Sequence, residues 1–125
     1  HLLMDLREKL NKSVLYITHD LGVVAKLCDN VAIMYAGKIL EQGDVYSVLQ
    51  NPKHPYTLAL IKCAPDLGSR HQSIVPIPGE LPDLLNLPAG CRFAPRCEHR
   101  IADCTKIPDI PLNKIDNSHY ARCVI

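Results

Sequence analysis

Residues 14–25 read VLYITHDLGVVA, an unbroken apolar run that passes directly into a helical pattern. The apolar residues predict a strand over residues 13–18 that is buried on both faces. Asp20 or Thr18 is a suitable N-cap for a helix predicted over residues 21–28. A buried strand followed at once by a helix indicates an α/β fold, in which ligands bind beyond the carboxyl ends of the strands.

Three further helices are expected in the first half of the chain. Leucines recur at spacings of three and four before Asn11 and predict an amphipathic helix that ends near that residue. A short helix is predicted over residues 45–50, capped by Asp44. Another is predicted over residues 55–63, with Pro55 in its first turn.

A β-hairpin is predicted between these helices. Residues 31–35 form a second apolar strand, and residues 38–42 form a third, more polar one. Ala36 and Gly37 between them form a tight turn, in which Gly37 supplies the positive φ that such a turn needs.

The character of the sequence changes after Pro65, where prolines recur with little periodicity. We expect this part to be a mostly irregular, cysteine-rich extension that burial alone cannot stabilise. The boundary is placed between Ala64 and Gln72. The predicted units are residues 1–66, the end of an α/β domain, and residues 67–125, the extension.

Composition and charge exclude several classes of protein. Fourteen basic and thirteen acidic residues give a net charge of +1, which provides no electrostatic basis for binding nucleic acid. No apolar run is long enough to span a bilayer, so we expect a cytoplasmic chain whose membrane connection comes through a partner. The chain begins at His1, inside an apolar periodic run, which predicts a fragment of a longer protein.

His19 stands at the functional edge of the predicted sheet, between the strand and the helix N-terminus. A histidine there can donate a hydrogen bond to a phosphate oxygen or orient an attacking water. The alternative is a histidine that only caps the following helix.

Three segments together carry a family resemblance: ITHDLGVVA at residues 17–25, MYAGKILEQG at residues 34–43, and NPKHPYT at residues 51–57. They resemble the switch-histidine segment and following hairpin of ABC-transporter nucleotide-binding domains, most closely the oligopeptide and dipeptide importers. The resemblance implies that His19 is the catalytic switch histidine, which contacts the γ-phosphate of ATP and helps to position water.

The family's other ATP-binding motifs are not found in this sequence. It contains no G-x-x-x-x-G-K-[ST] loop, no apolar strand ending in Asp-Glu and no ABC signature. By resemblance these lie upstream in the parent protein, which would bind ATP and Mg²⁺ and hydrolyse ATP. The isolated chain is therefore expected to be inactive as an ATPase.

The resemblance also implies partners and a location. The parent would be an ATP-binding subunit of a peptide importer, at the cytoplasmic face of the membrane. Its partners would be a second ATP-binding subunit, identical or not, two permease subunits and, indirectly, an extracellular solute-binding protein. Exposed strand edges predict self-association of this chain. The rival interpretation is a free-standing iron–sulfur or zinc-binding interaction module.

Four of the six cysteines gather late in the chain, separated by five, six and eighteen residues: Cys91, Cys97, Cys104 and Cys123. A structural zinc site usually uses close pairs two to four residues apart, and no such pair exists here. Wider spacing suits an iron–sulfur cluster, whose corners lie further apart.

The wording around these cysteines also resembles the family, in PAGCRFAPRC at residues 88–97 and HYARC at residues 119–123. By this resemblance all four cysteines are candidate thiolate ligands of a 4Fe–4S cluster. Neighbouring arginines would favour thiolates: Arg92, Arg96 and Arg122. Two alternatives remain open: two disulfides, or zinc with His119 replacing one thiolate.

Three other residues are interpreted as structural and not as ligands. Cys28 and Cys63 are expected to be small buried hydrophobic residues. His54 precedes a predicted helix and is read as a turn or packing residue.

Overall fold

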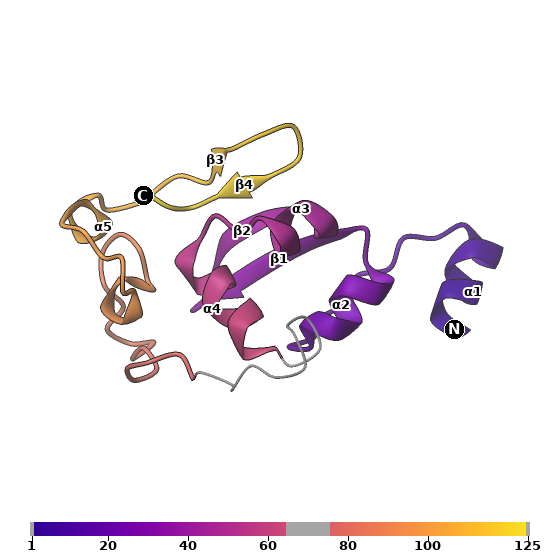
Figure 1. Ribbon diagram of the computed structural model, residues 1–125, viewed down its shortest axis with the longest axis horizontal. Coiled ribbons are helices and arrows are strands. Elements are labelled where there is room, and N and C mark those ends of the chain that lie inside the picture. Colours follow the sequence, from indigo (N-terminus) through magenta and orange to yellow (C-terminus); the bar gives the residue numbers. More distant parts are fainter. Residues whose placement is uncertain (1, 65–75, 125) are drawn as a thin grey trace.

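The computed structural model describes residues 2–64 and 76–124 (Figure 1). The elements in chain order are α1 (Leu2–Leu10), α2 (Leu21–Leu27), β1 (Asn30–Tyr35), β2 (Lys38–Asp44), α3 (Val45–Gln50), α4 (Pro55–Cys63), the 3₁₀ helix η1 (Ala94–Arg96), α5 (Asp103–Lys106), β3 (Asn113–Lys114) and β4 (Tyr120–Ala121). The described residues thus form a small α/β fold with one antiparallel sheet. The predicted unit boundary falls largely on residues 65–75, outside the described part.

The β1–β2 hairpin is the centre of the fold and confirms the sequence prediction. Its turn places Ala36 at a φ of 46° and Gly37 at a φ of 79°. Two consecutive positive φ values match the twist of the flanking strands in a two-residue hairpin. A bulge between Ile33 and Met34 shifts the register within the pair.

Short helices begin where the sequence predicts them. The Asp20 side chain accepts a hydrogen bond from the Val23 N–H at the start of α2. The Asp44 side chain accepts one from the Ser47 N–H, 2.9 Å away, at the start of α3. Each carboxylate satisfies a backbone donor that the first helical turn leaves unpaired.

The prediction of a strand over residues 13–18 is wrong. These residues form no regular element, and the side chains of Leu15 and Ile17 are 88% and 92% exposed. A strand buried on both faces needs neighbours on each side. Within residues 2–64 and 76–124, no strand pairs with this segment. The apolar run therefore forms an exposed, irregular segment between α1 and α2.

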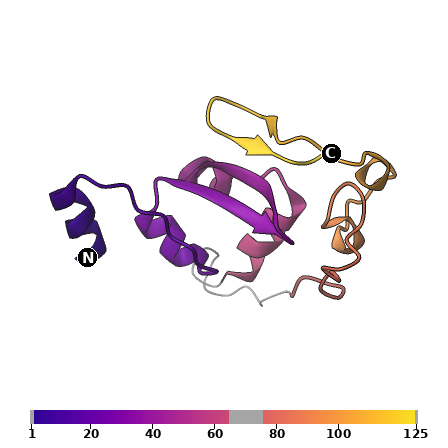
Figure 2. The ribbon, with the colours of Figure 1, turned by 180° about the vertical axis from the view of Figure 1, so that it is seen from behind.

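The carboxyl-terminal residues extend the sheet in a way that the sequence did not predict. Strand order is β1-β2-β4-β3, with Glu41 and Gln42 of β2 opposite Ala121 and Tyr120 of β4. Figures 1 and 2 show the β3–β4 hairpin running beside β2. Gly43 permits this approach, because a Cβ there would lie 2.7 Å from the Ser118 carbonyl oxygen.

The hydrophobic core lies between the tip of the β1–β2 hairpin and the cysteine-rich segment. Its buried members come from both: Tyr35, Leu40, Cys91, Phe93, Ala94, Cys104 and Ile110. The rings of Tyr35 and Phe93 meet edge to face, with centroids 5.4 Å apart. Burial of these apolar groups attaches the extension to the hairpin.

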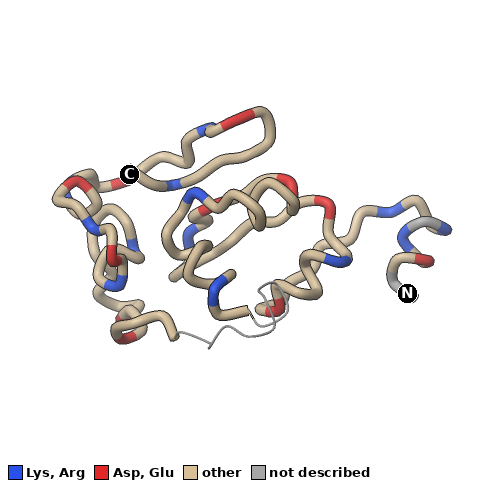
Figure 3. Tube along the Cα trace, viewed as in Figure 1, with Lys and Arg blue, Asp and Glu red and all other residues tan. Residues whose placement is uncertain are grey.

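Charges of both signs are interspersed in the hairpin region and in the extension (Figure 3). Among the described residues, no helix is long and apolar enough to cross a membrane.

Candidate functional site

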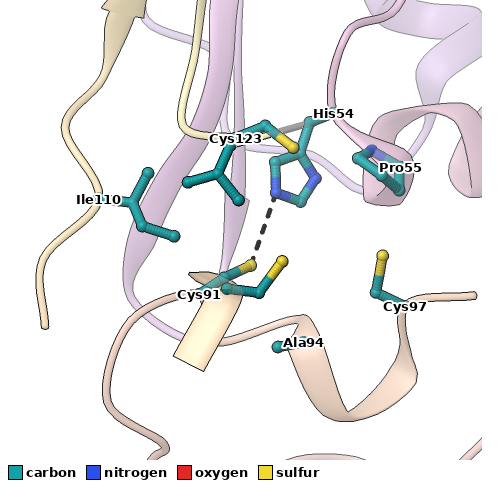
Figure 4. Close-up of a pocket in the computed structure, with 9 residues that line it drawn as sticks. His54, Pro55, Cys91, Ala94, Cys97, Ile110 and Cys123 are labelled. Carbon is teal, nitrogen blue, oxygen red and sulfur yellow. Dashed lines mark hydrogen bonds between the residues drawn. The ribbon is translucent and has the colours of Figure 1, made fainter. Parts of the chain in front are cut away.

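The four late cysteines come together around one cavity (Figure 4). The cavity is small, about 10 Å³, and has room for about one water molecule. It is lined by His54, Pro55, Cys91, Ala94, Cys97, Cys104, Ile110, Cys123 and Val124. Apart from the four cysteines and His54, the lining residues are apolar, so the thiols and the imidazole supply the chemistry of the cavity.

Gly90 brings the first and third cysteines together. The Cys91 N–H donates to the Cys104 carbonyl at 2.8 Å, and the Gly90 N–H donates to the Pro108 carbonyl at 3.1 Å. Gly90 has a φ of +77°, and a Cβ there would lie 2.4 Å from the Cys104 oxygen. Only glycine fits this close approach of two backbones.

The other two cysteines are positioned by neighbouring elements. Cys97 ends η1, where its N–H donates to the Ala94 carbonyl at 3.3 Å. Cys123 follows β4, and the Arg122 N–H beside it donates to the Leu40 carbonyl of β2 at 2.8 Å. The cavity is therefore complete only when the carboxyl-terminal hairpin is on the sheet.

Two of the four thiols, those of Cys91 and Cys97, lie in an environment that favours the protonated form. Cys91 and Cys104 are buried, and Cys97 and Cys123 are partly buried; none of the four is in a disulfide. Burial raises the pKa of the Cys91 thiol and that of the Cys97 thiol above the ordinary 9.0. Metal binding at this site must therefore release protons.

The expectation that neighbouring arginines favour thiolates is wrong at Cys91 and Cys97. The guanidinium groups are used elsewhere: Arg92 donates to the Ala36 carbonyl, Arg96 to the Ile77 and Pro78 carbonyls, and Arg122 to the Ile39 carbonyl. The Arg92 and Arg122 bonds hold the extension against the hairpin turn and β2, and the Arg96 bonds join two parts of the extension. Their role is to fix the backbone around the cavity.

His54 is the histidine that faces the cysteines. Its Nε2 lies 3.8 Å from the Cys91 sulfur, and its Nδ1 accepts a hydrogen bond from the Tyr56 N–H at 3.0 Å. The side chain is 1% exposed. Burial lowers the pKa of His54 from 6.5 to about 4, although the Glu41 charge opposes this shift. The ring is neutral at pH 7, with its proton on Nε2 because Nδ1 is an acceptor.

His119, the histidine considered as a zinc ligand, does not line the cavity. Its Nε2 lies 2.6 Å from Glu41 Oε1, and both residues are fully buried. Glu41 also accepts the Lys53 N–H at 2.7 Å and the His54 N–H at 2.9 Å. The carboxylate thus joins β2, the loop before α4 and the carboxyl-terminal hairpin. The alternative in which His119 replaces one thiolate as a zinc ligand is therefore wrong, because His119 does not line the cavity.

The donor set fits an iron–sulfur group, because such clusters are held by four cysteine thiolates. Cys91, Cys97, Cys104 and Cys123 all line the one cavity. The cavity between them is only about 10 Å³, so the site would have to widen to hold a cluster. Among the described residues, no three His, Cys, Asp or Glu side chains are grouped closely enough to hold a single metal ion.

The remaining sequence candidates lie apart from this cavity. His19 is exposed in the loop before α2, beside the capping Asp20. Cys28 and Cys63 are only partly buried, so the prediction of buried residues is wrong for both. The sequence pattern did not identify His54 and Glu41 as site residues. The N-cap position of His54 before Pro55 was recognisable, but its contact with Cys91, 37 positions away, was not.

Comparisons with known proteins converge on one group. The family model described as oligopeptide/dipeptide transporter, C-terminal region, matches residues 40–104, more than half of the chain. The oligopeptide transport ATP-binding protein OppD of Salmonella typhimurium is 44% identical over 98% of this chain and 36% of its own length. The proteins of the same name from Escherichia coli and Haemophilus influenzae are 40% and 42% identical, over 98% and 87% of this chain. The chain spans 36% and 34% of the lengths of these two relatives.

Proposed function

Because this chain belongs to the oligopeptide/dipeptide transporter C-terminal family, we propose that it is the carboxyl-terminal part of an ATP-binding subunit of a peptide importer. The observation that carries the proposal is the match to this family together with relatives named for oligopeptide transport and ATP binding. The whole protein would bind ATP and Mg²⁺ and couple ATP hydrolysis to uptake of peptides or similar small solutes. The isolated chain, without a phosphate loop, would not hydrolyse ATP.

His19 would be the catalytic residue contributed by this part of the protein. It is exposed directly before α2, so its imidazole is accessible to a nucleotide held by the rest of the subunit. There it would donate a hydrogen bond to the terminal phosphate and orient the attacking water.

The partners would be a second ATP-binding subunit, identical or different, and two permease subunits. The complex would lie at the cytoplasmic face of the membrane and receive solute from an extracellular binding protein. The exposed apolar segment that includes Leu15 and Ile17 supports burial of residues 14–17 in a larger assembly. In the isolated chain the same segment would cause self-association. Light scattering tests this, and a sharp monomer mass at moderate concentration would contradict it.

The four cysteines would hold a 4Fe–4S cluster, with zinc as a substitute. Cys91, Cys97, Cys104 and Cys123 would be its ligands, and the group would supply cross-links between segments that share little regular structure. Convergence of all four on one cavity supports this assignment. Residues 1–66 would then belong to the ATPase domain and residues 67–125 to a metal-stabilised extension.

Two measurements test these proposals. Full-length protein with its permease subunits is assayed for ATP hydrolysis and peptide uptake; a complex that neither hydrolyses ATP nor takes up peptide would remove the transport assignment. Full-length protein purified without oxygen is analysed for iron, sulfide and zinc. About four irons and four sulfides per chain, with visible absorption that bleaches on reduction, supports the cluster. Absence of all three would remove the metal site.

A further inference from the structure

His54 presents a single N–H group to the four-cysteine cavity, and its orientation is fixed. The Tyr56 N–H donates to Nδ1 at 3.0 Å, which leaves the ring proton on Nε2. Nε2 lies 3.8 Å from the Cys91 sulfur, the contact drawn as a dashed line in Figure 4. The hydrogen bond to one ring nitrogen therefore determines which atom faces the sulfur.

Several contacts prevent the ring from turning away. His54 caps α4, and its backbone N–H donates to the buried Glu41 carboxylate at 2.9 Å. The Phe93 ring packs on the imidazole, with centroids 6.0 Å apart. With 1% of its surface exposed, the residue has no route to solvent for its Nε2–H.

We propose that His54 is a positioning residue for the proposed metal group, donating an Nε2–H···S hydrogen bond to the Cys91 sulfur. The inference rests on the proposed metal site. A hydrogen bond to a ligating thiolate withdraws negative charge from the sulfur, which favours the reduced, more negative state of a cluster. It also stabilises the thiolate against loss of metal.

Direct ligation by His54 is the less favoured role. Coordination through Nε2 needs a lone pair on that atom, so the proton would have to move to Nδ1. Nδ1 would then become a donor and lose its bond from the Tyr56 N–H, which caps α4. Donation to sulfur requires neither change.

Two substitutions distinguish the role of His54 as a hydrogen-bond donor to sulfur from its role as the N-cap of α4. Asparagine in His54→Asn retains an oxygen near the place of Nδ1 and can cap α4, but it has no donor at the place of Nε2. Glutamine in His54→Gln extends its amide N–H to about the place of Nε2, while its cap is weaker. His54→Ser, with an N-cap residue that also lacks the donor, replaces His54→Asn if that variant does not fold.

The measurements use full-length protein purified without oxygen. The readouts are the iron, sulfide and zinc content, the reduction potential of the bound group and the rate of metal loss to a chelator. We expect His54→Asn to shift the potential to more negative values and to weaken metal retention about 10- to 100-fold. His54→Gln should return both quantities toward wild type.

The outcomes distinguish the inference from the site on which it rests. Wild-type potential and retention in His54→Asn would overturn the inference, and equal losses in both variants would reduce His54 to a packing residue. Wild-type protein with four reactive thiols and neither iron nor zinc would instead overturn the metal site itself.

Discussion

Glu41 Oε1 and His119 Nε2 lie 2.6 Å apart, and neither side chain is exposed to solvent. The same carboxylate accepts the Lys53 and His54 N–H groups, so one buried carboxylate satisfies three donors from two separate segments. Each of these donors would be costly to bury unpaired. Glu41 therefore couples the carboxyl-terminal hairpin to the loop that presents His54.

Replacing Glu41 by alanine should destabilise the fold strongly. The change leaves two backbone N–H groups and the imidazole without an acceptor, and breaking a buried pair in this way costs about 3–5 kcal/mol. Denaturant unfolding provides the measurement. The exposed Arg7–Asp29 pair, 3.0 Å apart, is the matched control, because Asp29→Asn should cost only about 0–1 kcal/mol. Similar losses for both variants would contradict the role of Glu41.

Gly90→Ala should disrupt the cysteine cavity more than the equivalent change at Gly79. Both glycines have a positive φ, 77° and 79°, so the backbone strain is comparable. A Cβ at residue 90 meets the Cys104 carbonyl at 2.4 Å, whereas one at residue 79 meets the flexible Arg96 side chain at 3.3 Å. We expect loss of metal for Gly90→Ala alone, and a larger fall in the unfolding midpoint for Gly90→Ala than for Gly79→Ala, because only the first adds a backbone clash to the strain. Equal metal content and equal unfolding midpoints in the two variants would show that the positive φ, and not contact with Cys104, determines the effect of the substitution.

Local features of the fold could be predicted because nearby residues determine them. The Asp44 cap, the positive φ of Gly37 and Pro55 at the start of α4 each act within a few residues. The apolar run at residues 14–17 could not be placed, because the burial of a strand depends on the strands beside it. Its pattern carries no information on whether those neighbours are present.

The candidate site could be predicted only in part, for the same reason. The spacing and resemblance of the cysteines gave candidate ligands, and all four line one cavity. Which histidine faces them depends on contacts across the fold: His119 contacts Glu41, 78 positions away in sequence, and His54 contacts Cys91, 37 positions away. β3 and β4 are only two residues long each, too short for a periodic pattern.

Lowering the pH should destabilise the start of α3, because it protonates the capping carboxylate of Asp44. Hydrogen bonds from Ser47, and then from Ser118, lower the pKa of Asp44 from 3.8 to about 2. A carboxyl whose folded pKa is lowered contributes stability above its unfolded value, and this contribution is lost as the pH falls from about 3.8 to about 2. Asp44→Asn retains an N-cap without a titrating group, so its unfolding midpoint should depend less on pH in this range. Identical acid profiles would contradict this account.

His19→Ala should reduce ATP hydrolysis by the full-length subunit about 100-fold or more, because it removes a group proposed to orient the attacking water. Stability should change little, since His19 is exposed. His99→Ala, at another exposed histidine, is the control and should retain activity. Full hydrolysis in His19→Ala would remove this residue from the catalytic assignment.

Single cysteine-to-serine substitutions should distinguish the cysteines that line the cavity from those elsewhere in the chain. Cys104→Ser removes a buried thiol from the cavity, whereas Cys28→Ser alters a partly buried cysteine that does not line it. A hydroxyl is a poor ligand for iron or zinc compared with a thiolate, so Cys104→Ser should lose the metal. Without cross-links between its segments, the extension should become more sensitive to proteolysis. Cys28→Ser should retain metal and protease resistance, and equal metal content in both variants would show that the metal binds elsewhere.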